Sequence, residues 1–114
     1  QDVLIGLAAS GNTPFTCKVL EEAFKKDALT IAVSNNPNGK LLEFGKCKII
    51  LDTKEELIAG STRLKAGTAQ KICLNIISSL VMIKMGRVKN GKMSHMLPTN
   101  QKLRDRKIRL DNQA

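Results

Sequence analysis

The stretch VLIGLAASGNTP, residues 3–14, decides the fold class. Its first six residues are apolar without alternation, a pattern typical of a strand buried on both faces of a parallel sheet. Small and turn-forming residues follow, and then Thr13 and Pro14 provide an N-cap and a first position for a helix that extends to about Lys26. A buried strand that leads through a tight turn into a helix predicts an α/β fold.

The chain repeats this strand–helix–strand rhythm. Apolar runs at 29–33 and 47–52 predict a second and a third strand, with a loop at 34–39 and a short helical turn around 40–45 between them. The connections are short, which favours βαβ units with right-handed crossovers.

Residues 62–85 predict a long helix that ends at Gly86. Apolar residues cover most of its circumference, so we expect it to be buried or shared with another subunit. No apolar run reaches the length that we expect of a membrane span. Residues 87–97 are weakly patterned, and Pro98 and Thr99 open a last helix.

Composition and charge limit the possible functions. The 114 residues are 42% hydrophobic and 25% charged, which indicates a globular chain, and the absence of Trp and Tyr argues against a nucleic-acid surface built on stacked aromatic rings. The net charge of +9 is uneven, since residues 84–109 carry nine Lys or Arg and one acidic residue. We therefore divide the chain into residues 1–86 and a basic segment, 87–114. That segment is a solvated tail, an anion-facing surface or a nucleic-acid contact.

The three cysteines do not form a recognisable site. Cys17, Cys47 and Cys73 lie far apart, without a CxxC pair, and the chain has one histidine. A disulfide framework and a zinc site both fit this pattern poorly. We expect Cys47 and Cys73 to be small core residues of a reduced, cytoplasmic protein.

The turn after the first strand has the features of an anion site. Open α/β sheets bind ligands at the carboxyl ends of their strands, beside helix N-termini. Here Gly11 allows close approach of the backbone, and Ser10 and Thr13 supply hydroxyl groups. The Lys of a Walker A loop and the GxGxxG pattern are absent, which argues against ATP and dinucleotides. A small phosphate site and an ordinary strand–turn–helix cap both remain open.

The stretch GSTRLKAGTAQK, residues 60–71, contains residue types similar to those of the turn after the first strand. Hydroxyl and cationic side chains cluster in its first half: Ser61, Thr62, Arg63 and Lys65. Arg and Lys suit phosphate oxygens, but cations are unfavourable at the positive end of a helix dipole. Either Glu55 and Glu56 or a bound anion should compensate for them. We find no pairing of residues that argues for catalysis.

Taken together, DVLIGLAASGNTPF, GSTRLKAGTAQK and TNQKLRDR (99–106) resemble the sugar isomerase (SIS) domain of the N-acetylmuramic acid 6-phosphate etherases, relatives of the glucokinase regulatory proteins. The resemblance implies a flavodoxin-like three-layer sandwich around a parallel sheet, of which this chain is the second half. It also implies a cytoplasmic homodimer with no membrane association.

The family cleaves the D-lactyl ether of N-acetylmuramic acid 6-phosphate, by elimination and then water addition, to N-acetylglucosamine 6-phosphate and D-lactate. It uses two glutamates and no metal or organic cofactor. Those glutamates lie upstream of the matching region, so the resemblance implies no catalytic residue here and no activity of the isolated chain. It implies a sugar-phosphate site made by these residues: Ser10, Gly11, Thr13, Glu56, Ser61, Thr62 and Arg63.

Two alternatives remain to the interpretation of this chain as part of an etherase. One is a non-catalytic regulatory SIS domain that binds sugar phosphates. The other is a basic nucleic-acid-binding module, which would show steep salt dependence and indifference to sugar phosphates.

Overall fold

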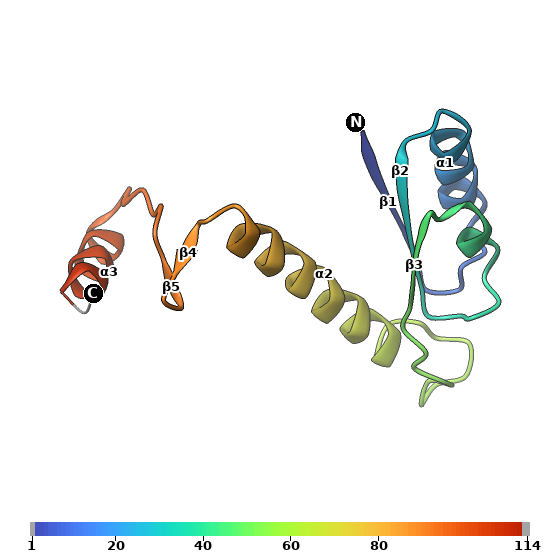
Figure 1. Cartoon of the computed structure of the whole chain (residues 1–114). Coiled ribbons are helices and arrows are strands. Elements are labelled where there is room, and N and C mark those ends of the chain that lie inside the picture. The colour runs from blue at the N-terminus through green and yellow to red at the C-terminus, as the bar shows by residue number, and fades with distance from the viewer. Residues whose placement is uncertain (1, 113–114) are drawn as a thin grey trace. The chain divides into compact units, whose positions relative to one another are not determined.

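The computed structural model describes residues 2–112 and confirms the α/β class (Figure 1). The elements, in chain order, are β1 (Val3–Ala8), α1 (Pro14–Lys25), β2 (Leu29–Ser34), the 3-10 helix η1 (Lys40–Phe44), β3 (Cys47–Ile50), α2 (Lys65–Lys84), β4 (Val88–Lys89), β5 (Lys92–Met93) and α3 (Gln101–Asp111). The chain divides into two compact units, Gln1–Cys73 and Leu74–Ala114.

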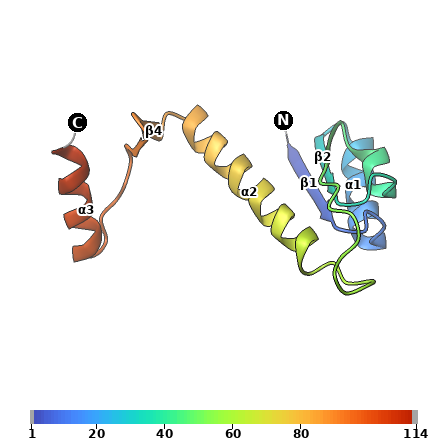
Figure 2. The same ribbon diagram turned by 90° about the horizontal axis from the view of Figure 1, so that it is seen from below.

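The first unit is built on a parallel sheet in the order β1-β2-β3. Val3 lies opposite Leu29 in the β1–β2 register, and Ile31 lies opposite Cys47 in the β2–β3 register. Helix α1 covers one side of β1 and β2 (Figure 2). The predicted βαβ rhythm requires neighbouring strands to be parallel, and the observed pairing confirms this prediction.

The core lies between the sheet and α1. Its buried members come from β1, β2, α1 and η1: Ala8, Cys17, Leu20, Ala32, Leu41 and Leu42. The side chains of Leu20 and Leu41 are fully buried. A Cβ at Gly6 would lie 3.1 Å from Leu20 Cδ2 and 3.2 Å from Leu41 Cδ1, so a glycine here lets the helix layer pack closely on β1.

Two expectations about the sheet are wrong. The third strand ends at Ile50, two residues earlier than predicted. Cys47 is exposed, whereas Cys17 and Cys73 are buried. Cys47 lies on an edge strand and faces away from α1, which explains why its apolar surroundings in the sequence do not bury it. Within residues 2–112, no group of three or more His, Cys, Asp or Glu residues is placed to hold a metal ion.

Helix α2 begins three residues later than predicted, and of the two alternatives for its apolar surface, burial within the described chain is wrong, whereas sharing with another subunit stays a prediction. Among its 20 residues, Ala66 and Cys73 are the buried ones. By length and composition α2 is also long and apolar enough to cross a membrane, contrary to the expectation from the sequence. It ends as predicted, because Gly86 adopts φ 71° and its N–H donates to the carbonyl of Ile83.

The second unit contains a hairpin that the sequence analysis missed. Strands β4 and β5 pair antiparallel, with Val88 opposite Met93. Asn90 and Gly91 connect them with positive φ angles of 50° and 73°, the Asn-Gly signature of a tight hairpin. The last helix begins two residues later than expected, and Asn100 Oδ1 caps it by accepting a hydrogen bond of 2.9 Å from the Leu103 N–H.

Candidate functional site

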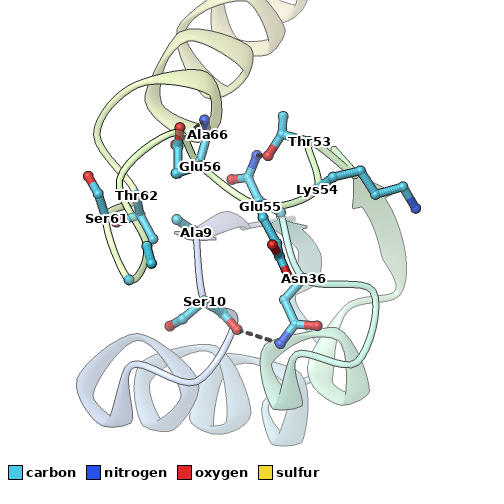
Figure 3. A pocket seen from close by; sticks show the side chains of 13 residues that line it. Ala9, Ser10, Asn36, Thr53, Lys54, Glu55, Glu56, Ser61, Thr62 and Ala66 are labelled. Atoms are coloured by element: carbon cyan, nitrogen blue, oxygen red, sulfur yellow. Dashed lines mark hydrogen bonds between the residues drawn. The ribbon is translucent and has the colours of Figure 1, made fainter.

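A pocket of about 400 Å³ lies in the first unit, at the carboxyl ends of the strands (Figure 3). Its walls come from the segments that follow β1, β2 and β3 and from the start of α2. The lining residues are Ala9, Ser10, Asn35, Asn36, Thr53, Lys54, Glu55, Glu56, Ala59, Gly60, Ser61, Thr62 and Ala66. Position and size both match those of small-molecule sites in open α/β sheets.

The loop after β1 is held rigidly behind the pocket. Gly11 has φ 69°, and a Cβ there would lie 2.5 Å from Gly39 Cα and 2.6 Å from Ser34 Oγ. The Gly11 carbonyl accepts a 2.8 Å hydrogen bond from the Leu41 N–H. The Ser10 carbonyl accepts one of 3.1 Å from Asn36 Nδ2, drawn as a dashed line in Figure 3. The backbone of Ser10 is thereby fixed while its side chain lines the pocket.

Asn35 joins three segments through one amide. Its Nδ2 donates to the Leu51 carbonyl at 3.0 Å and to Thr53 Oγ1 at 3.4 Å. Its Oδ1 accepts from Gln70 Nε2 of α2 at 2.8 Å. The end of β2, the segment after β3 and the start of α2 are therefore mutually positioned by this residue.

Glu56 caps the N-terminus of α2. Its Oε1 accepts a hydrogen bond from the Ala66 N–H and its Oε2 one from the Lys65 N–H, both at 2.9 Å. These backbone bonds, that from Ala66 first, lower the pKa of Glu56 below its ordinary value. The carboxylate thus compensates for the basic first turn, as one of the sequence alternatives predicted. A group held in its ionised form in this way is unsuited to act as a general acid.

The GSTR loop forms the remaining wall. Gly60 has φ 77°, and the Ser61 N–H donates to the Ile58 carbonyl at 3.0 Å. Ser61 Oγ in turn accepts a 3.3 Å bond from the Arg63 N–H. This tight turn places Ser61 and Thr62 in the pocket lining, across from Ala9 and Ser10 (Figure 3).

The structure brings together four of the seven residues expected to form the site. Ser10, Glu56, Ser61 and Thr62 line the pocket. Gly11 is not in the lining, and its carbonyl is hydrogen-bonded to the Leu41 N–H. Thr13 and Arg63 lie outside the lining.

Thr13 stands at the N-cap position of α1 as predicted, but its side chain makes no capping hydrogen bond. The side chain of Arg63 is exposed, one residue beyond Thr62.

Four polar or charged lining residues were missed from the sequence: Asn35, Asn36, Thr53 and Lys54. The signal that could have found them is their position, because residues 34–36 and 53–54 directly follow the second and third predicted strands, and parallel strands end at the same edge of a sheet.

The lining offers polar hydrogen-bonding groups more than positive charge. Among the described residues, Lys54 is the cation that lines the pocket, and its side chain extends away from the other labelled side chains (Figure 3). It forms an ion pair of 2.5 Å with Asp52. Hydroxyl and amide groups from three strand ends suit a ligand with several polar oxygens.

Comparison with known proteins gives a consistent family. The chain is 47% identical over 114 residues to the N-acetylmuramic acid 6-phosphate etherase of Deinococcus radiodurans, covering all of this chain and 37% of that protein. The etherases of Symbiobacterium thermophilum and Oceanobacillus iheyensis are each 46% identical, with 99% and 100% of this chain and 38% and 39% of those proteins covered. No protein-family model matches the chain.

The chain therefore spans less than two fifths of the length of the curated relatives it matches. The resemblance carried by the three sequence motifs is confirmed along essentially the whole chain. This chain is a homologue of one part of the N-acetylmuramic acid 6-phosphate etherases.

Proposed function

We propose that this chain is part of an etherase acting on N-acetylmuramic acid 6-phosphate, and that it supplies one wall of the sugar-phosphate site. The single observation that carries the proposal is the pocket at the carboxyl ends of the three strands, lined by residues of two of the three motifs that carry the etherase resemblance. The 42–47% identity to proteins named as such etherases supports the same reaction.

Within this proposal the hydroxyl groups of Ser10, Ser61 and Thr62 donate hydrogen bonds to oxygens of the sugar phosphate. Gly11 sets the shape of the first loop, and Thr13 marks the N-terminus of α1 beside it. Arg63 is exposed next to Thr62 and supplies positive charge to the bound phosphate. Glu56 holds the start of α2 and thereby orients the GSTR loop.

The reaction converts the ether and water to N-acetylglucosamine 6-phosphate and D-lactate. Its general acid needs a proton at neutral pH. The lowered pKa of Glu56 opposes that role. We therefore assign the acid and the base to the part of the etherase outside this chain. No step assigned to this chain needs a metal or an organic cofactor.

Calorimetric titration of the chain with N-acetylmuramic acid 6-phosphate tests the proposal, with N-acetylmuramic acid as the ligand that lacks the phosphate. The phosphorylated sugar should bind, and the unphosphorylated one should bind much more weakly. We expect no D-lactate from the chain alone. Equal affinity for the two sugars, or binding to neither, would remove the sugar-phosphate site.

Matched variants locate the site. Thr62→Val and Ser10→Ala should each weaken binding by about 3- to 10-fold, as expected for one lost hydrogen bond. Thr68→Val and Ser79→Ala change exposed residues of α2 that do not line the pocket, so they should leave affinity unchanged. Equal effects of Thr62→Val and Thr68→Val would place the ligand elsewhere.

The proposal extends to a cytoplasmic, homodimeric etherase. Fractionation of cells that express the chain tests the location, and sedimentation of the complete etherase tests the dimer. A membrane-bound fraction would instead point to the apolar helix α2.

A further inference from the structure

All four methionines of the chain and its one histidine line a single cavity in the second unit, which we call the methionine cavity. It has a volume of about 430 Å³ and lies where α2 is followed by the β4–β5 hairpin (Figure 1). The methionines come in two pairs with a spacing of three residues, MIKM (82–85) at the end of α2 and MSHM (93–96) from β5 onward. The lining residues are Met82, Met85, Arg87, Val88, Met93, His95 and Met96.

Backbone hydrogen bonds hold the two methionine pairs near one another. The Arg87 N–H donates to the Met82 carbonyl at 2.9 Å, which closes the end of α2. Val88 lies opposite Met93 in the hairpin, and the Ser94 N–H donates to the Arg87 carbonyl at 2.9 Å. The backbone of the cavity is therefore fixed, whereas methionine side chains, with three rotatable bonds, can adapt to a small ligand.

Ser94 fixes the tautomer of His95. Ser94 Oγ donates its one proton to the Gly86 carbonyl at 3.0 Å. The same oxygen lies 2.8 Å from His95 Nδ1, where it can then only accept, so Nδ1 carries the proton of the neutral ring. The lone pair of the imidazole is consequently on Nε2. Metal-binding histidines are oriented in this way, by a hydrogen bond from the nitrogen that does not bind the metal.

The donor set of the cavity selects the kind of metal ion. Thioether sulfur is a soft ligand that favours Cu(I), and imidazole suits copper as well. Among the described lining residues there is no carboxylate, and Arg87 adds a positive charge. Ca²⁺, Mg²⁺ and Mn²⁺ need carboxylate or carbonyl oxygens, so these surroundings oppose them. A monovalent soft ion is repelled least by the positive charge and matches the neutral sulfur donors.

We propose that the methionine cavity binds one Cu(I) ion through methionine sulfurs and Nε2 of His95, with Ser94 as a positioning residue. The bound ion ties the end of α2 to the hairpin. Each ligand is neutral, so binding releases no proton, and it transfers no electron. The inference does not depend on the proposed function, because the methionine cavity shares no lining residue with the pocket at the strand ends.

Titration of the whole chain with Ag(I) tests the site. Ag(I) has the charge and the soft-ligand preference of Cu(I) but is not readily oxidised or reduced. Cys47 is an exposed thiol that would compete for the ion, so the titration uses Cys47→Ser, in which Cys17 and Cys73 stay buried. Nuclear magnetic resonance follows the methionine methyl groups and the imidazole nitrogens of His95.

One equivalent of Ag(I) should shift the methionine signals and the Nε2 signal of His95, and Cu(I) under anaerobic, reducing conditions should do the same. Mg²⁺ should shift neither. Methionine signals that do not move at one equivalent overturn the site, as do equal shifts with Mg²⁺. Loss of the metal site should leave the titration with N-acetylmuramic acid 6-phosphate unchanged, so the two proposals fail separately.

Matched variants test the ligands. Met93→Leu removes one sulfur and nearly conserves the volume of the side chain, so it should weaken Ag(I) binding without unfolding the chain. Ile83→Leu introduces the same residue at an exposed position of α2 outside the cavity and should leave the affinity unchanged. Circular dichroism verifies that each variant folds. Equal affinities of the two folded variants contradict the assignment.

A second set of variants tests the positioning role of Ser94. Ser94→Ala retains every proposed ligand and should weaken Ag(I) binding about 10- to 100-fold, as loss of a hydrogen-bond partner of a metal-binding histidine does. The imidazole nitrogen signals of His95 should show the proton on Nδ1 in the native chain and lose that preference in Ser94→Ala. Ser94→Thr should restore both, and Ser79→Ala, on the exposed surface of α2, should change neither. An unchanged tautomer in Ser94→Ala overturns this role.

Discussion

Replacement of Gly11 by alanine should destabilise the first unit far more than the same replacement at Gly60. Both glycines have positive φ, 69° and 77°, so both variants carry the conformational cost of a Cβ in the left-handed region, about 1–2 kcal/mol. Alanine also restricts the unfolded chain, which offsets about 0.4–1 kcal/mol of that cost. For Gly60, with nothing within 4 Å of the added Cβ, the net loss is about 0.5–1 kcal/mol.

Gly11 adds a steric term. Its Cβ would lie 2.5 Å from the Cα of Gly39 and 2.6 Å from Ser34 Oγ, and the backbone of Gly39 cannot move away as a flexible side chain can. Overpacking of this kind costs about 1–3 kcal/mol more, which brings Gly11→Ala to a net loss of about 1.5–4 kcal/mol.

Urea unfolding measures the difference. The chain has no Trp or Tyr, so far-ultraviolet circular dichroism follows the transition. Pulsed thiol labelling of Cys17 follows the first unit specifically, because this buried thiol lies 3.5 Å from the Gly11 carbonyl. Equal losses of unfolding free energy for Gly11→Ala and Gly60→Ala would refute the close approach of the loops that contain Gly11 and Gly39.

Three further predictions concern separate parts of the chain. Leu20→Ala, at a fully buried site of the core, should lower the free energy of unfolding by about 2–5 kcal/mol, measured by the same urea titration. The pKa of Glu56 is lowered from 4.5 by folding, so its stabilisation is present above that pH and is lost as pH falls through the lower folded-state pKa. Urea midpoints from pH 7 to 3 should therefore fall more steeply in the native chain than in Glu56→Gln, and parallel curves would contradict the cap. Asn100→Ala should cost α3 about 0.5–2 kcal/mol and reduce helicity, and unchanged circular dichroism would argue against that cap.

The strand–helix order was predictable because periodicity and turn residues report local structure. Val3–Ala8 is an unbroken apolar run, and Pro14 has its preferred place at the first helical position. Burial was less predictable, because it depends on what packs against an element. An apolar pattern suggested that Cys47 and α2 are buried. In the described chain, however, Cys47 and most of α2 are exposed.

Only part of the candidate site could be predicted, because motifs report local sequence and do not report which segments meet in space. Ser10, Ser61 and Thr62 were found because they stand in recognisable motifs. Asn35 carries no motif, and its importance follows from which strand ends meet at one edge of the sheet. Two alternatives were offered to compensate for the basic turn, Glu55 and Glu56 or a bound anion, and the carboxylate of Glu56 is found at the helix N-terminus.

The amide of Asn35 has a consequence for which sequences can build this pocket. It donates on one side, to the Leu51 carbonyl and Thr53 Oγ1, and accepts on the other, from Gln70. Aspartate has the same shape but cannot donate when ionised, so it would set a negative charge against the oxygen of Leu51. Position 35 thus selects one of two isosteric residues by the direction of its hydrogen bonds, and a replacement of Gln70 would have to preserve the donor that meets it.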